Sequence, residues 1–174
     1  MTDQDRKIKT DRMRYIKNKF SSNLALVAII FDVFFFVSIY KSDVSTYYYT
    51  LLIGVSIVYN LAFMLAAFLS SEGVKSYGEG YCYLLIVLGI IQFVRIFIIP
   101  WRASHAEVTI ANEAVVVMES AQFLRCTLFL VISGICCIVA AVVGIQRSRT
   151  LKAYVATLGE EHRRDYWPHS AYSI

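Results

Sequence analysis

The chain has 174 residues, of which 57 % are hydrophobic and 17 % are charged, and its 17 Lys and Arg residues outnumber its 13 Asp and Glu residues. Soluble domains are about 45–50 % apolar, so this composition excludes an ordinary soluble domain and favours a chain that lies in a lipid bilayer. Twelve of the basic residues lie in the two tails, a clustering that the net charge of +4 hides.

Residues 1–21 form a basic segment ahead of the first apolar run. Its seven cationic residues are Arg6, Lys7, Lys9, Arg12, Arg14, Lys17 and Lys19. We expect a juxtamembrane helix that sets the membrane orientation and lies on anionic lipid headgroups. A docking helix for a cytoplasmic partner is the alternative. Nucleic-acid binding is not expected, because a cationic run beside a span is common in membrane proteins.

Four apolar runs follow, at about residues 22–40, 48–70, 80–100 and 124–145. Each is long enough, at about 1.5 Å per residue, to cross the roughly 30 Å hydrocarbon layer of a bilayer. Helices are expected because lipid offers no hydrogen-bond partners to an open backbone. The first run is expected to be retained, because no signal-peptide cleavage site follows it. The sequence therefore predicts an all-α, polytopic membrane protein with a four-helix transmembrane domain over residues 22–145.

An even number of spans places both tails on the same side of the membrane. Because both tails are rich in Lys and Arg, the positive-inside rule predicts that both termini are cytoplasmic, and we expect the protein in the plasma membrane. The longest loop, residues 101–123, is then outside, and we expect its segment 105–122 to extend the fourth helix outward or to lie on the membrane surface. The cytoplasmic C-terminal tail, residues 146–174, is predicted to continue the fourth helix and to break at Gly159.

Polar residues lie inside the predicted spans at similar depths. Asp32 is in the first span, Asn60 in the second, and Gln92 and Arg95 in the third. An unpaired charge in the middle of a span costs about 2.5–3.5 kcal/mol on insertion scales, so we expect an Asp32–Arg95 ion pair flanked by Gln92 and Asn60. Ser56 and Tyr59 belong to the same layer.

The predicted ion pair has three interpretations. It is either a latch that fixes the pairing of the helices or part of a polar pocket for a proton, an ion or a substrate. In the third, Arg95 extends outward to the interface while Asp32 meets another subunit. The only prolines, Pro100 and Pro168, lie outside the middle of any span, so the broken helices that are typical of transporters are not expected.

Small residues recur at helical spacing along the fourth span. One ridge is Ser133, Cys137 and Ala141, and the other is Cys136, Ala140 and Gly144. The second span carries a similar ridge of Ala62, Ala66 and Ser70. Such ridges let helix backbones approach closely. They indicate either packing within one bundle or a face for a second membrane protein.

No catalytic motif is present in the sequence, and we expect neither a cofactor nor a metal. His105 and Glu107 lack further ligands nearby, and the four Cys fit no zinc spacing and are interpreted as small apolar side chains. The predicted function is that of a non-catalytic accessory or assembly subunit of a larger membrane complex, such as a transporter. The alternative is a self-sufficient oligomeric transporter or an ion or proton channel that uses Asp32. An enzyme is the least favoured reading.

Overall fold

The computed structural model describes residues 8, 10–13, 16–39, 47–105, 107–110, 113–116 and 118–157, and for 47–53, 107–110 and 113–116 it describes the backbone alone. Four of its helices are long and apolar enough to cross a membrane. They are α2 (Lys19–Ile39), α3 (Tyr47–Lys75), α4 (Glu79–Ile98) and α6 (Ser120–Ala156). The prediction of a helical fold with four helices long and apolar enough to span a membrane is therefore confirmed.

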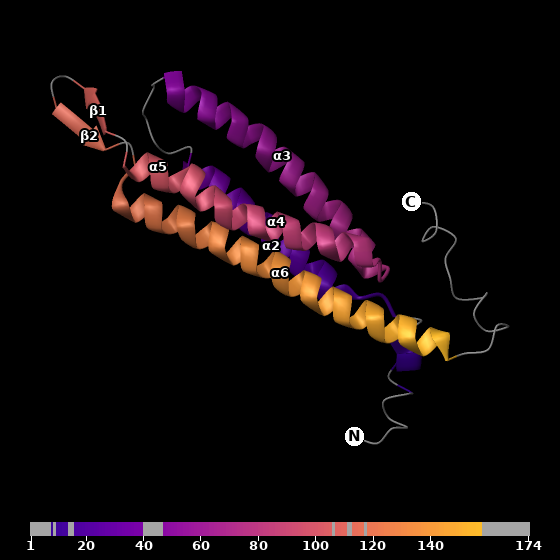
Figure 1. Ribbon diagram of the computed structural model, residues 1–174. Helices are drawn as coiled ribbons and strands as arrows, with labels where there is room; N and C mark the ends of the chain where they lie inside the picture. The colour runs from indigo at the N-terminus through magenta and orange to yellow at the C-terminus, as the bar shows by residue number, and fades with distance from the viewer. Residues whose placement is uncertain are drawn as a thin grey trace.

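The four long helices form a bundle in which successive spans run in opposite directions (Figure 1). α6 packs against α2 and α4, and α3 packs against the same two helices. α2 and α4 therefore face each other across the bundle, as do α3 and α6. The start of α2, the α3–α4 turn and the end of α6 lie together, since Asn18 N–H donates to the Lys75 carbonyl at 3.0 Å and Ser148 Oγ to the Tyr77 carbonyl at 2.7 Å. We call this the tail end, and the opposite one the hairpin end.

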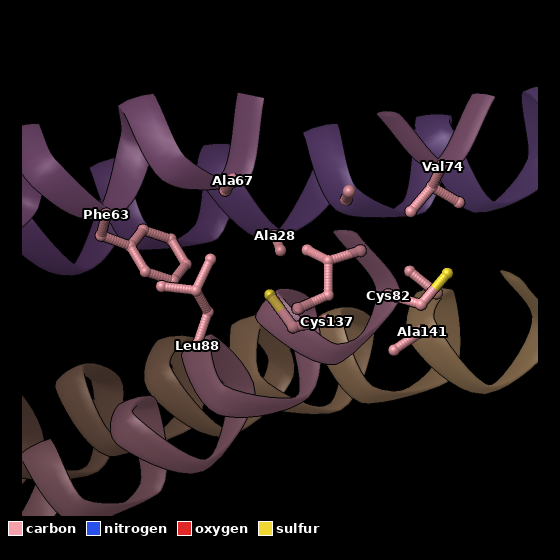
Figure 2. Packing of buried hydrophobic residues seen from close by; sticks show 11 residues of the cluster. Ala28, Phe63, Ala67, Val74, Cys82, Leu88, Cys137 and Ala141 are labelled. Atoms are coloured by element: carbon pink, nitrogen blue, oxygen red, sulfur yellow. The ribbon is translucent and has the colours of Figure 1, made fainter. Parts of the chain in front are cut away.

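Small and apolar side chains fill the interior of the bundle. In the half nearer the tail end, Phe63 and Leu85 are fully buried among alanines of α2, α3 and α6 (Figure 2). Nearer the hairpin end, Phe35 and Leu130 belong to a second buried cluster. The alanines let the helices approach closely, because a methyl group takes little space between two backbones.

The outer surface of the bundle is apolar as well. Large side chains such as Val58, Leu65 and Phe97 are more than half exposed, and similar residues cover the outward faces of all four long helices. Monomeric soluble proteins rarely expose continuous apolar surfaces of this extent. The distribution fits lipid as the surrounding solvent, and with the four long apolar helices it describes a membrane-integral protein.

α4 and α6 cross where two glycines meet. A Cβ atom on Gly89 would lie 3.0 Å from the Gly134 carbonyl oxygen and 2.8 Å from Cγ1 of Ile138. A Cβ atom on Gly134 would lie 2.9 Å from the Phe93 ring. The close approach of these two helices therefore depends on the absence of side chains at both positions.

The segment between α4 and α6 differs from its prediction. α4 ends at Ile98, and Pro100 begins the short helix α5 (Pro100–Ser104), because proline suits the first position of a helix. The strands β1 (Glu107–Ile110) and β2 (Glu113–Val116) then form an antiparallel hairpin, with Glu107 opposite Val116 and Ile110 opposite Glu113. An outward extension of the fourth helix through this stretch is therefore wrong. Its β-branched residues, chiefly Val and Ile, favour strands over a helix.

α6 is longer than the predicted fourth span. Its 37 residues rise about 55 Å at about 1.5 Å per residue, against a hydrocarbon layer of about 30 Å. The helix passes the α3–α4 turn and ends at Ala156, where Tyr154 Oη donates to Asp11 Oδ1 at 3.2 Å. Parts of the predicted basic segment, residues 1–7, 9, 14 and 15, and the predicted tail from 158 onward, Gly159 included, lie outside the described residues.

Candidate functional site: a polar layer inside the bundle

Each span directs one stripe of residues into the bundle, and the polar residues lie on these stripes. On α2 the buried residues include Ala28, Asp32 and Phe35, and on α4 they include Leu88, Gln92 and Arg95. The spacing alternates between three and four residues, which keeps successive side chains on one helix face. The same spacing brings Ser56 and Asn60 of α3 and Ser133 of α6 to the inside.

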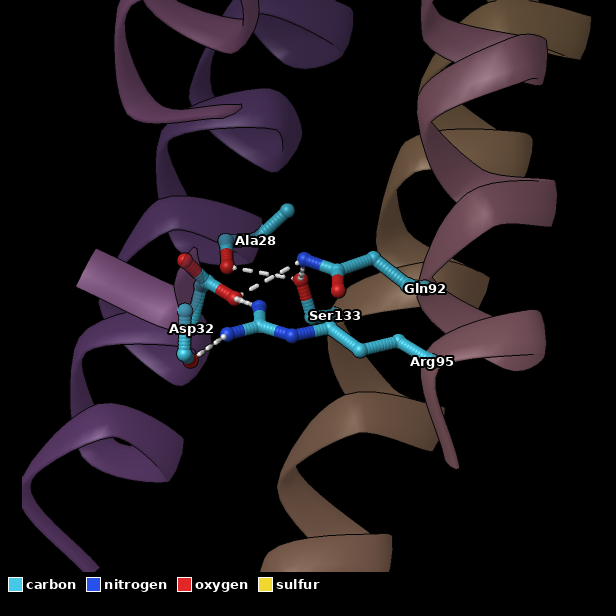
Figure 3. A network of polar contacts seen from close by, with 6 residues as sticks. Ala28, Asp32, Gln92, Arg95 and Ser133 are labelled. Carbon is cyan, nitrogen blue, oxygen red and sulfur yellow. Dashed lines mark hydrogen bonds and ion pairs between the residues drawn. The ribbon is translucent and has the colours of Figure 1, made fainter. Parts of the chain in front are cut away.

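Asp32 and Arg95 form an ion pair across the centre of the bundle. Arg95 Nη1 lies 2.9 Å from Asp32 Oδ1, and both residues are buried (Figure 3). Gln92 Nε2 donates to the same carboxylate oxygen at 2.9 Å. The two charges come from the diagonal helices α2 and α4, so the pair joins helices that share few other contacts.

Arg95 is also held by α3. Its Nη2 donates to Ser56 Oγ at 2.9 Å. Its guanidinium carbon lies 4.4 Å from the centroid of the Phe35 ring and 4.5 Å from that of Tyr59. Such cation–π contacts gain strength when the cation is desolvated. The guanidinium group is therefore anchored by a carboxylate, a hydroxyl and two aromatic rings.

α6 completes the layer through Ser133. Its hydroxyl donates to the Ala28 carbonyl of α2 at 2.9 Å and lies 3.5 Å from Gln92 Nε2. All four spans thus contribute to one connected network. A network of this kind resists separation of the helices, since each broken bond would leave a polar group in an apolar interior.

Asn60 lies one helical turn from Ser56, which bonds to Arg95, but no hydrogen bond joins Asn60 to the ion pair. The residue is buried on α3, and neither its amide nitrogen nor its amide oxygen has a hydrogen-bond partner in the part of the chain that the structure describes. The structure therefore brings together Asp32, Gln92 and Arg95 as we expected, and leaves Asn60 unbonded beside them. The interpretation in which Arg95 extends outward is wrong, because its side chain is 4 % exposed.

Two members of the layer were not predicted. Phe35 was seen only as part of an apolar run, and Ser133 only as part of a small-residue ridge. The three-and-four spacing is the signal that could have identified both, because Phe35 follows Asp32 by three residues on the inner stripe of α2. Ser133 likewise lies on the inner stripe of α6, with Leu130 and Cys137.

The small-residue ridges of the fourth span lie inside the chain's own bundle. Ser133, Cys137, Ala140, Ala141 and Gly144 are buried in α6, and Cys136 is half-buried. A Cβ atom on Gly144 would lie 2.7 Å from Cys82 Sγ of α4. The ridge of the second span is different, because Ser70 is buried and Ala66 half-buried, whereas Ala62 is exposed.

A second group of polar side chains lies at the tail end. Ser22 and Ser71 share a hydrogen bond at 2.8 Å between their hydroxyls, and Ser21 donates to the Ala140 carbonyl. Arg147 Nη1 donates to Asn18 Oδ1 at 2.8 Å. These bonds tie α2 to α3 and α6 without a buried ion pair.

The turn between α3 and α4 contains Tyr77, which has a φ of 61°. Gly78 N–H donates back to the Gly73 carbonyl at 3.0 Å, which closes the end of α3. The Tyr77 hydroxyl donates to the Ile16 carbonyl at 2.8 Å. Burial raises the pKa of the Tyr77 phenol, an effect that nearby Arg147 opposes.

Among the residues that the structure describes, no three His, Cys, Asp or Glu side chains gather to hold a metal ion. Comparison of the chain with protein-family models, curated proteins and solved structures finds no match. The polar layer is therefore interpreted from its own geometry.

Proposed function

We propose that this chain is a non-catalytic accessory or assembly subunit of a larger membrane complex, such as a transporter. The observation that carries the proposal is the buried Asp32–Arg95 ion pair, whose hydrogen-bond network includes residues of all four spans. A carboxylate held this way serves as a latch, because freeing it would leave two charges without partners in an apolar interior. The polar groups of the spans then serve to hold the bundle together.

The partner surface that we propose is the outer face of α3. Ala62 is exposed there between the large apolar side chains of Leu61 and Leu65. A small residue on a lipid-facing helix allows a second helix to approach closely. The ridges of α6 do not serve this purpose in our proposal, since the chain's own helices cover them.

We also propose that the tail end faces the cytoplasm of the cell and that the membrane is the plasma membrane. Lys17, Lys19, Arg149 and Lys152 are exposed at or beyond this end. Cations of cytoplasmic segments attract anionic headgroups, which contributes about 1 kcal/mol for each cation near the surface. In this orientation the hairpin of β1 and β2 lies outside the cell.

The test of the subunit role is purification in mild detergent followed by mass determination of the intact complex. The proposal predicts recovery of a larger partner in fixed stoichiometry. Ala62→Trp should lower the amount of partner recovered and leave the abundance of this chain unchanged. Leu124→Trp is the matched control, because Leu124 is 67 % exposed on α6 and lies away from α3. A lone monomer or homo-oligomer from native membranes would contradict the proposal.

One observation favours the alternative of an oligomeric transporter or a proton or ion channel. Asp32 Oδ2 has no hydrogen-bond partner among the described residues, so one carboxylate oxygen is left to take a proton or a cation. Flux measurements on reconstituted vesicles separate the two functions. A channel or transporter predicts flux that Asp32→Asn abolishes while the assembly persists, whereas the subunit role predicts no flux from the isolated chain.

A further inference from the structure

Buried polar atoms without partners are concentrated at one place in the bundle. Among the described residues eight such side-chain atoms occur, and six belong to the polar layer. The other two are Asn18 Nδ2, at the tail end, and Thr127 Oγ1, near the hairpin end. The six are Asp32 Oδ2, Tyr59 Oη, Asn60 Nδ2, Asn60 Oδ1, Gln92 Oε1 and Arg95 Nε.

The depth of Asn60 places it beside the other members of this set. Ser56 bonds to Arg95, and α3 runs from the hairpin end toward the tail end, so Asn60 lies about 6 Å nearer the tail end than Ser56. α4 runs the opposite way, so Gln92 lies about 4.5 Å nearer the tail end than Arg95. Asn60 and Gln92 therefore occupy similar levels on neighbouring helices, one turn below the guanidinium group.

These atoms differ from ordinary exposed polar groups because the spans give them no access to bulk water. Asp32, Gln92, Asn60 and Arg95 are each at least nine-tenths buried. A buried donor or acceptor without a partner carries its full desolvation penalty, and six in one polar layer would oppose the packing that the direct hydrogen bonds favour. A bound polar molecule that reaches several of them removes this conflict.

The charges and hydrogen-bonding capacities define the chemistry of that molecule. Asp32 and Arg95 neutralise each other, so a neutral occupant leaves the charges of the site balanced. Arg95 Nε and Asn60 Nδ2 donate, whereas Asp32 Oδ2, Gln92 Oε1 and Asn60 Oδ1 accept. The occupant must be neutral, small, and able both to donate and to accept.

We propose that the polar layer is an internal water site, in which bound water bridges Asn60 of α3 to the Asp32–Arg95 pair of α2 and α4. Buried waters in proteins make about three hydrogen bonds each, and the unpartnered atoms of the layer are numerous enough to be their partners. α3 is then joined to the ion pair twice, directly through Ser56 and through water at Asn60. The proposal is independent of the subunit role, since a latch and a transport site could each hold this water.

The direct test is a structure of the intact protein crystallised from a lipid mesophase, at a resolution that shows ordered water. The proposal predicts density for water within hydrogen-bond distance of Asn60 and of at least one atom of the ion pair. Density that is empty there, or a direct bond between Asn60 and Gln92 or Arg95, would overturn it.

A second test compares two substitutions that each remove an unpartnered polar group. Asn60→Leu keeps the side chain at about the same size, and Thr127→Val does the same at the matched control position. If water joins Asn60 to the pair, Asn60→Leu lowers the midpoint of thermal unfolding by about 3–6 °C, because other atoms lose a partner, and Thr127→Val does not lower it. An equal or higher midpoint for Asn60→Leu would contradict the proposal. If this variant does not fold, the wild-type density decides.

Discussion

The centre of the bundle and its tail end both bury polar side chains, but they satisfy them in different ways. At the centre, Asp32 and Arg95 are charged and bond within α2, α3 and α4, and Gln92 extends the network to Ser133 of α6. At the tail end, Ser21, Ser22 and Ser71 are neutral and bond to nearby carbonyls or to one another. A buried charge without its partner is far more costly than a free hydroxyl. The centre therefore determines which helices must pair, whereas the tail end only tightens helices that are already paired.

Removing one charge should have the largest effect on stability. Arg95→Leu leaves the Asp32 carboxylate buried without its cation, and we expect a loss of about 3–5 kcal/mol in the free energy of unfolding. Arg125→Leu is the matched control, because Arg125 is exposed and its side chain bonds within its own helix, at 3.4 Å to the Ala121 carbonyl. Unfolding in lipid nanodiscs measures both variants. If both variants lost the same free energy of unfolding, the buried charge would be no more important for stability than an exposed one.

A bulky residue at the helix crossing should have the next largest effect. Gly89→Leu places atoms against the Gly134 carbonyl and Ile138, where a Cβ alone would already lie at 3.0 and 2.8 Å. We expect a loss of about 1–3 kcal/mol, because α4 and α6 must move apart. Gly54→Ala is the control, since a Cβ there meets no described atom within 4 Å apart from its chain neighbours and its own helix backbone. Gly54→Ala should be neutral or stabilise α3 by about 0.5–1 kcal/mol. A loss of stability in this control would show that close packing at the glycine does not explain the effect of Gly89→Leu.

At the tail end a hydroxyl deletion should cost less. Ser22→Ala removes the bond to Ser71, and we expect a loss of about 0.5–1.5 kcal/mol in the free energy of unfolding. Thr150→Ala is the control, because this exposed hydroxyl bonds within its own helix, to the Gln146 carbonyl. If Ser22→Ala were as damaging as Arg95→Leu, the tail end would be as important as the centre for helix pairing.

The smallest effect is a pH dependence at the α3–α4 turn. Burial raises the pKa of Tyr77, so the folded protein holds this proton more tightly than the unfolded chain. The stability that follows is fully present below the ordinary phenol pKa of about 10 and is lost as pH rises through the higher folded value. Between pH 8 and 11 the wild type should therefore lose more stability than Tyr77→Phe. If the free energy of unfolding fell equally with pH in both proteins, the pH dependence could not be assigned to Tyr77.

Much of the central layer could be predicted because a charged side chain inside a span must find an opposite charge or hydrogen-bond partners. Asp32 and Arg95 had to find partners, and counting residues along antiparallel helices placed them at compatible depths. The four spans followed from the length of the apolar runs. Both arguments need only the composition and spacing of single helices.

The remaining features depend on how the helices are rotated and packed. Phe35 and Ser133 join the layer only because their inner stripes face Arg95 and Ala28, respectively. A ridge of small residues does not reveal whether it faces its own bundle or a partner, and in α6 it faces inward. The hairpin was not predicted because its strands contain Glu and Ala among their β-branched residues, and both residue types are common in helices.

A double-mutant cycle tests most directly whether Asp32 and Arg95 act as a latch. Asp32→Asn, Arg95→Gln and the double variant are compared with the wild type by unfolding in nanodiscs. The latch predicts that the double variant is more stable than the sum of the single losses implies, with a coupling of about 1–3 kcal/mol. Losses that add to within about 0.5 kcal/mol would show that the two residues do not stabilise the bundle as a pair.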